Sequence, residues 1–393
     1  MGRREYPTVL ELVGSTPIVR LERLSRSVPG ELLAKLEYLN PGGSVKDRIG
    51  LAMIEAAERE GKLRPGGTIV EPTSGNTGVG LAIAAALRGY RSIFVMPDKM
   101  SQEKISMLRA YGSQVVITPT AVEPSSPESY YSVSDRLAEE IPGGFKPDQY
   151  SNPANPEAHY ETTAAEIWEQ TDGGEVDAIV VSVGTGGTVT GIGRYFKERK
   201  PEVLIVGADP EGSVYTAKRE DDLHPYLVEG IGKDTWPKTM DASVVDEWVR
   251  VSDRDSFQTA RRLAREEGLL AGGSSGTTVH AAIEAMQQYG ISQIPVVRND
   301  EADSLADVVG SLQERALLDR VFRNPDALNE DVAVAMQPPL PAVDADASLD
   351  DVYEGLSGPS GAVVVASRGR PTGILTRSDL LEFLAARRSQ LEP

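Results

Sequence analysis

Lys46 lies in the stretch NPGGSVKDR, between a strand-like run and the first turn of a helical pattern. Ser44 and Asp47 have the spacing of a capping box for this helix. A helix N-terminus disfavours a further positive charge, which tends to lower the pKa of an amine placed there. A partly neutral lysine can act as a nucleophile or as a base. From this stretch alone, an ordinary exposed lysine is the simpler interpretation.

A second polar turn, EPTSGNTG, also separates a strand-like run from a helical pattern. Hydroxyls, an amide and several backbone N–H groups meet at this helix start, which suits a carboxylate or another anion. Ordinary N-capping explains one hydroxyl but not the whole polar set. The predicted anion site consists of Thr73, Ser74, Gly75, Asn76 and Thr77.

The third turn, VVSVGTGGTVTG, is rich in glycine and threonine. Its N–H groups and hydroxyls could surround a phosphate, although Gly-rich turns also serve close packing. It is no Walker loop, because the Gly-Lys-Ser/Thr ending is missing. The candidate phosphate loop consists of Gly184, Thr185, Gly186, Gly187 and Thr188.

Together the three turns supply an amine, an anion site and a phosphate cradle. Pyridoxal 5'-phosphate needs this set, because its aldehyde condenses with a lysine and its ring takes up the electrons of a carbanion. We therefore expect pyridoxal 5'-phosphate as the cofactor, and no metal ligands.

The elements around these turns alternate between short β-rich runs and amphipathic helical patterns from about residue 30 to 210. This alternation predicts an α/β fold with a helix-covered parallel sheet. Ligands bind at the carboxyl ends of the strands in such sheets. We therefore expect the three turns to share one sheet edge.

Composition limits the function classes. The chain has 393 residues and a formal charge of -19, which disfavours nucleic-acid and membrane partners and favours small-molecule chemistry. Cysteine is absent, which excludes disulfides and metal sites with cysteine ligands. The histidines His159, His224 and His280 lie far apart in the sequence, and we expect packing or surface roles for them. No apolar run reaches membrane-spanning length, which predicts a cytoplasmic protein.

The last hundred residues contain a weak internal repeat. The segments beginning YGISQIPVV and GPSGAVVVA each predict a strand, a polar turn, a second strand and a helix. We expect a catalytic module over 1–280, a first repeat over 281–325 and a second over 331–393.

The ordered motifs VGSTPIVRL, GGSVKDR, EPTSGNTGVGLA, GTGGTVTG, VEGIG and AGGSSG make the chain resemble the cystathionine β-synthase and cysteine synthase family of fold-type II pyridoxal-phosphate enzymes. The resemblance covers most of residues 10–280. The stretches YLNPGG and SYYSVSDRL are more similar to the cystathionine β-synthases. The C-terminal repeats resemble a tandem pair of CBS domains, which bind adenosyl ligands such as S-adenosylmethionine or adenine nucleotides.

The resemblance implies a role for each matching residue. Lys46 would bind the cofactor covalently and act as the base, and Asn76 would contact the ring hydroxyl. Residues 184–188 would hold the phosphate. The substrate carboxylate and pocket would be formed by Thr73, Ser74, Gly75, Thr77, Gln149, Tyr150, Gly230 and Gly232.

In the second CBS repeat, Thr376 and Asp379 match the nucleotide signature, although the same pair also forms a capping box. Gln313 and Ala316 stand at those positions in the first repeat, where a ligand is not expected.

The implied reaction is the condensation of L-serine with L-homocysteine to L-cystathionine and water, a transsulfuration step in cysteine biosynthesis. The rival readings are an O-acetylserine-dependent sulfhydrylase and a catalytically silent adenosyl-ligand sensor. The resemblance also implies a homodimer or a larger homo-oligomer. No haem is expected without cysteine.

One departure from the family concerns the helix that follows AGGSSG, which leads directly into the first CBS repeat. A further core strand and the turn near the ring nitrogen of the cofactor are missing. Either the natural protein contains them, or a real deletion leaves an incomplete sheet with an open edge. We expect the helix at about 277–290 to be shared by the two domains.

Overall fold

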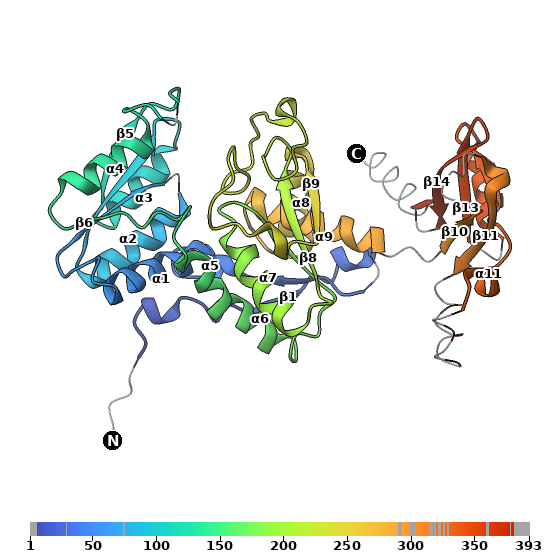
Figure 1. Ribbon diagram of the computed structural model, residues 1–393, viewed down its shortest axis with the longest axis horizontal. Coiled ribbons are helices and arrows are strands. Elements are labelled where there is room, and N and C mark those ends of the chain that lie inside the picture. The colour runs from blue at the N-terminus through green and yellow to red at the C-terminus, as the bar shows by residue number, and fades with distance from the viewer. Residues whose placement is uncertain are drawn as a thin grey trace, which may run out of the picture. The chain divides into compact units, whose positions relative to one another are not determined.

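The computed structural model describes residues 6–289, apart from 29, 74 and 124, and much of 293–380 (Figure 1). Its gaps in the latter range are 299–303, 314–316, 318–319, 321–323, 325–326, 328–329, 359–360 and 378. Two compact units make up the chain, Met1–Met286 and Gln287–Pro393.

The first unit contains two parallel sheets, so the expectation of one shared sheet edge is wrong. One sheet has the order β5-β4-β3-β6 and the other β7-β8-β9. Their strands are β3 Thr68–Pro72, β4 Arg91–Pro97, β5 Gln114–Thr118, β6 Gly144–Phe145, β7 Ala178–Ser182, β8 Leu204–Pro210 and β9 Glu247–Val251. The second turn follows β3 and the third follows β7.

The turn that carries Lys46 follows a different kind of strand. β2 (Leu33–Lys35) pairs antiparallel with β1 (Ile18–Arg20), and both belong to a separate two-stranded sheet. The strand-like run predicted before the lysine turn forms a strand of only three residues. A short 3-10 helix, Glu37–Leu39, separates it from the lysine turn.

Helices cover the sheets of the first unit, as the alternating pattern predicts (Figure 1). They are α1 Lys46–Arg59, α2 Asn76–Arg88, α3 Gln102–Ala110, α4 Tyr130–Glu140, α5 Ala154–Ala158, a π-helix His159–Ala164, α6 Ala165–Gln170, α7 Gly187–Arg199, α8 Asp253–Glu266 and α9 Gly273–Tyr289. Helix α1 packs against α2 and α5, and α5 packs against α7. This chain of packed helices connects the three turns.

Helices α1 and α2 cross in direct backbone contact. A Cβ on Gly80 would lie 2.8 Å from the carbonyl oxygen of Lys46, and one on Gly50 would lie 2.7 Å from the carbonyl carbon of Gly80. Only glycine permits such a close approach. The crossing places the lysine turn beside the first turn of α2, where the anion site was predicted.

The second unit contains strand pairs of the kind predicted for each repeat. β10 (Gln293–Val297) pairs antiparallel with β11 (Val308–Gln313), and β13 (Ala362–Ser367) pairs antiparallel with β14 (Arg370–Thr376). β12 (Ala342–Asp344) lies parallel to β13. The described helices are α11 Val332–Ala335 and α12 Leu349–Leu356.

The junction between the units falls within α9, after Met286. Within the described part of the chain, the sheet β7-β8-β9 contains no fourth strand. No described helix is long and apolar enough to cross a membrane.

Candidate active site

Lys46 is the first residue of α1, but the predicted capping box does not form. Val45 is the N-cap without a side-chain bond, and Ser44 Oγ accepts instead from the Lys46 N–H at 3.2 Å. The Asp47 carboxylate turns back to accept from the Gly42 N–H. The PGG turn thus lies too close to Asp47 for that side chain to return to Ser44.

The amine of Lys46 is desolvated, and this burial lowers its pKa to about 8. Within the described residues, no hydrogen bond or ion pair engages Lys46 Nζ. A buried lysine without a counter-ion is available for covalent chemistry.

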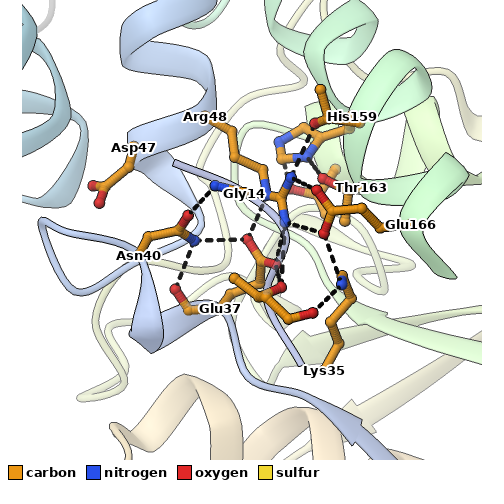
Figure 2. Close-up of polar contacts among 12 residues, drawn as sticks. Gly14, Lys35, Glu37, Asn40, Asp47, Arg48, His159, Thr163 and Glu166 are labelled. Carbon is orange, nitrogen blue, oxygen red and sulfur yellow. Dashed lines mark hydrogen bonds and ion pairs between the residues drawn. The ribbon is translucent and has the colours of Figure 1, made fainter. Parts of the chain in front are cut away.

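A buried ion-pair cluster around Arg48 holds the start of α1 (Figure 2). The guanidinium donates to Glu37 at 2.7 and 2.8 Å and to Glu166 at 2.7 and 2.8 Å. Lys35 adds a second cation 2.9 Å from Glu166. Guanidinium–carboxylate pairs with two hydrogen bonds each hold the side chains in a fixed orientation and also balance their charges. The cluster joins α1 to α6 and to the segment before the lysine turn.

The second turn opens α2 and has the polar character predicted for it. Thr73 and Thr77 are buried, whereas Asn76 is exposed at the helix start. Thr73 Oγ1 accepts from the Gly75 N–H at 3.3 Å. The prediction for Ser74 lies outside the described residues.

The structure brings Gln149 and Tyr150 to this turn. Gln149 Oε1 accepts from the Thr77 hydroxyl at 2.6 Å, which confirms that these predicted site residues are neighbours. The fully buried Glu71 holds their loop, because its carboxylate accepts from the N–H groups of Asp148 and Gln149 at 2.8 and 3.0 Å. Burial raises the pKa of Glu71 to about 7.

The third turn is a cradle that only glycine can form. A Cβ on Gly187 would lie 1.9 Å from Asn155 Oδ1, and one on Gly184 would lie 2.7 Å from the Gly230 carbonyl oxygen. Gly186 adopts φ +81°, a conformation that favours glycine. The first N–H groups of α7, which have no partner within the helix, follow directly on this turn.

The VEGIG loop lies against the third turn, as its assignment to the site requires. Gly232 donates its N–H to the Val183 carbonyl at 2.7 Å, and Gly230 and Gly232 have φ values of +87° and +70°. Both predicted pocket glycines are thus beside the candidate phosphate loop.

Two residues that the motifs did not identify, Asn155 and Thr239, connect the third turn to the backbone of Gln149 and Tyr150. Asn155 Nδ2 donates to the Gln149 carbonyl at 2.8 Å and to Thr185 Oγ1 at 3.1 Å. Thr239 Oγ1 donates to the Thr185 carbonyl at 2.6 Å, and its N–H donates to the Tyr150 carbonyl at 3.2 Å. Asn155 lies 30 positions before Thr185, outside the three predicted turns.

These features fit pyridoxal 5'-phosphate. The turn has no room for a Cβ on its glycines, so its backbone stays bare, and Asn155 Oδ1 lies beside Gly187, buried without a hydrogen-bond partner among the described residues. The Lys46 amine lies close enough for its charge to lower the pKa of His159, which contacts Thr188 of the third turn. Among the described residues, no cluster of His, Asp or Glu could hold a metal ion. The chain's own residues would hold the aldehyde at Lys46 and the phosphate at the N-terminus of α7.

The family comparison agrees with this geometry. Residues 9–297 match the family described as pyridoxal-phosphate dependent enzyme. The chain belongs to this family. Residues 274–322 and 330–386 match the CBS domain, which confirms the predicted tandem pair. The two matches overlap at α9, the helix that we expect the two domains to share.

Curated relatives narrow the family branch. The chain is 44% identical over 406 residues to cystathionine beta-synthase of Oryctolagus cuniculus, covering 98% of this chain and 72% of that protein. It is 49% identical over 333 residues to the enzyme of the same name from Rattus norvegicus, covering 84% of this chain and 58% of the relative. The predicted family, fold class and enzyme class, a pyridoxal-phosphate-dependent lyase, are confirmed.

Solved structures share the fold of the catalytic part. O-ureido-L-serine synthase superposes with a TM-score of 0.68 at 40% identity, covering 72% of this chain and 88% of that structure. A hydrogen sulfide-producing enzyme from Fusobacterium nucleatum superposes with a TM-score of 0.68 at 36% identity, covering 73% of this chain and 94% of that structure.

Proposed function

We propose that this chain condenses L-serine with L-homocysteine to give L-cystathionine and water. The observation that carries the proposal is the convergence of the anion turn and the Gly-rich cradle. Asn155 bonds the cradle to the Gln149 backbone, and the Gln149 side chain accepts from Thr77 of the anion turn. The similarity to relatives named cystathionine beta-synthase supports this choice of reaction.

Lys46 has two tasks in this reaction. Its amine, with a pKa near 8, can be neutral at moderate pH, so it can bind the cofactor aldehyde. The free Lys46 amine would take the proton from Cα of a serine held beside it. The cofactor supplies an electron sink for the resulting charge.

The loops position the substrates. We assign the serine carboxylate to the turn of Thr73, Gly75 and Thr77, where N–H groups and hydroxyls gather, with Gln149 beside it. Residues 184–188 would hold the phosphate and Asn76 the ring hydroxyl. In the net replacement the Cβ–O bond of serine breaks, the hydroxyl leaves as water with the proton of the homocysteine thiol, and the sulfur forms the new Cβ–S bond. The Lys46 amine would return the proton to Cα. Holding both ends of the reacting molecule accelerates the step by orientation.

The decisive measurement is a steady-state assay with chromatographic detection of cystathionine. Serine with homocysteine should give the highest kcat/KM, and the purified protein should have a visible absorbance band that borohydride removes. A protein that uses O-acetylserine with sulfide and leaves serine unreacted would contradict the proposal. That alternative deserves the comparison because the structural neighbours include a hydrogen sulfide-producing enzyme.

A catalytically silent sensor is the remaining alternative. Colourless protein, or a spectrum unchanged by Lys46→Ala, would support it. The assay uses the chain in its present form, so it also tests whether the expected loss of a core strand is tolerated.

We also propose one adenosyl ligand, S-adenosylmethionine or an adenine nucleotide, at the second CBS repeat. Thr376 Oγ1 and N–H each donate to Asp379 Oδ2 at 2.7 Å, so this pair forms the local cap whether or not a ligand binds. Isothermal titration with S-adenosylmethionine, AMP and ATP tests the site. The absence of binding heat with all three ligands would contradict the proposed adenosyl site.

We place the protein in the cytoplasm as a homodimer or larger homo-oligomer that lacks haem. Light scattering coupled to gel filtration should give a mass of at least twice 42.2 kDa, and the purified protein should show no Soret band. A monomer would contradict the proposed assembly.

A further inference from the structure

His159 is a buried histidine held between two hydroxyl groups. Its Nδ1 lies 2.9 Å from Thr163 Oγ1, and its Nε2 lies 3.1 Å from Thr188 Oγ1. Thr188 belongs to the candidate phosphate loop, whereas Thr163 contacts the other ring nitrogen from the same π-helix as His159 (Figure 2). The imidazole therefore connects the loop to the helix behind it.

The backbone around His159 fixes the ring in this place. Residues His159–Ala164 form a π-helix between α5 and α6, and such local widening is frequent at functional sites. Helix α7 is pressed against it, because a Cβ on Gly191 would lie 2.6 Å from the His159 Cβ. Gly191 is one turn after Thr188, so the same face of α7 carries the close contact and the hydroxyl.

The ring has one donor and one acceptor. Burial and the nearby charges of Lys46 and Arg48 lower the pKa of His159 well below its usual value, so the imidazole is neutral. A neutral imidazole donates from one nitrogen and accepts at the other. Its two partners are both hydroxyls, which can donate or accept.

The phosphate decides the direction of these bonds. A phosphate dianion has only acceptor oxygens, so Thr188 binds it by donating its hydroxyl proton. Thr188 Oγ1 must then accept from His159 Nε2–H, which leaves Nδ1 to accept from the Thr163 hydroxyl. All three donations run toward the phosphate.

We propose that His159 is a positioning residue that aims the Thr188 hydroxyl at the cofactor phosphate, within the donor chain Thr163 to His159 to Thr188. This proposal rests on the proposed function, in which residues 184–188 hold the phosphate. It also changes the sequence-based expectation for His159, which was a packing role.

The experiment compares two cofactor forms on the apoprotein. Pyridoxal 5'-phosphate and pyridoxal share the aldehyde but differ in the phosphate, so the ratio of their Kd values isolates the phosphate contact. In His159→Phe, the Kd for pyridoxal 5'-phosphate should rise about tenfold, in the range of one lost hydrogen bond to a charged group, and the Kd for pyridoxal should stay within about twofold. The phosphorus-31 resonance of the bound cofactor should shift in parallel.

Further variants separate aiming from packing. His159→Gln keeps a donor at the position of Nε2. The ratio of the Kd for pyridoxal 5'-phosphate to the Kd for pyridoxal should therefore return most of the way to the wild-type value. Thr163→Val removes only the outer hydroxyl and should raise the ratio about threefold. Thr171→Val is the matched control, since this buried threonine donates to the Ile167 carbonyl in the next helix and should leave the ratio unchanged.

The outcomes are distinguishable. If His159→Phe weakens both cofactor forms equally, or still weakens the phosphate form tenfold in a Thr188→Ala background, His159 acts by packing and the proposal is wrong. If His159→Phe does not fold, an unchanged ratio in Thr163→Val overturns it instead. Wild-type protein that binds pyridoxal as tightly as pyridoxal 5'-phosphate would contradict the phosphate site itself, and with it the proposed function.

Discussion

The Thr77 hydroxyl donates to Gln149 Oε1 at 2.6 Å, although the two residues are 72 positions apart. Both side chains are buried. The bond occupies the carbonyl oxygen of the Gln149 amide and leaves its NH₂ group as a donor beside the anion turn. The Gln149 NH₂ group is therefore the donor that this pair offers to a substrate carboxylate, because the Thr77 hydroxyl proton is used within the pair.

Replacing Gln149 by Glu should disrupt this pattern. The new carboxylate would oppose the substrate carboxylate, so the KM for serine should rise at least about tenfold, corresponding to ~1.4 kcal/mol. The cofactor absorbance band should remain. Gln102→Glu, at an exposed position on α3, is the control and should leave the KM unchanged. An unchanged KM in Gln149→Glu would exclude the residue from the carboxylate site.

The pKa of Lys46 predicts how cofactor capture depends on pH. Only the neutral amine attacks an aldehyde, and burial lowers the pKa of Lys46 from 10.5 to about 8. The rate at which apoprotein takes up pyridoxal 5'-phosphate should therefore rise with pH, reach half its maximum near pH 8 and level off above. Stopped-flow absorbance measures this rate.

Two comparisons accompany this profile. Pyridoxine 5'-phosphate has no aldehyde, so its binding should lack the rise at pH 8. Lys46→Ala should abolish the borohydride-sensitive band. A rate that still climbs about tenfold between pH 8 and pH 9 and reaches half its maximum near pH 10.5 would show an ordinary, solvated lysine.

The glycine cradle predicts a specific steric defect. In Gly187→Ala, the new Cβ would meet Asn155 Oδ1 at 1.9 Å, so the turn must open. Affinity for pyridoxal 5'-phosphate should fall at least about tenfold, and thermal stability should fall with it.

Gly193→Ala provides a control in the same helix. Its Cβ would meet Val244 Cγ2 at 2.6 Å, away from the turn. This variant should lower Tm without changing the ratio of affinities for pyridoxal 5'-phosphate and pyridoxal. Equal ratios in the two alanine variants would argue that Gly187 serves packing alone.

The Arg48 cluster predicts a loss of stability in acid. Its hydrogen bonds from Arg48 and Lys35 lower the pKa of Glu166 from 4.5 to about 2, against the opposing effect of burial. Because the folded protein releases this proton more readily than the unfolded chain, the stabilisation is complete above about pH 4.5 and is lost as pH falls toward 2.

Glu166→Gln should remove that dependence. The free energy of unfolding at pH 7 should fall by about 2 kcal/mol, below the range for fully buried pairs because Glu166 keeps some contact with water. Its decline between pH 4.5 and 2 should also become shallower. Glu169→Gln, at an exposed position on the same helix, should behave like the wild type in urea titrations at each pH. Identical acid profiles for all three proteins would contradict this account.

The local signals in the sequence were sufficient to predict the positions of the three turns. Glycine and threonine patterns after short apolar runs identified the residues at the starts of α1, α2 and α7, because those features depend on neighbouring residues. The resemblance then indicated what the turns bind. The capping box at Ser44 and Asp47 failed because the Asp47 side chain bonds to Gly42 instead.

The tertiary structure alone decided how the turns meet. They lie on separate sheets, joined by the direct crossing of α1 and α2 and by the side chains of Asn155 and Thr239. The contact on which the proposed role of His159 rests also required the tertiary structure, since its partner Thr188 is 29 residues away. Contacts between distant segments depend on how the helices and loops pack, so a local sequence pattern does not predict which residue a buried polar group will bond to.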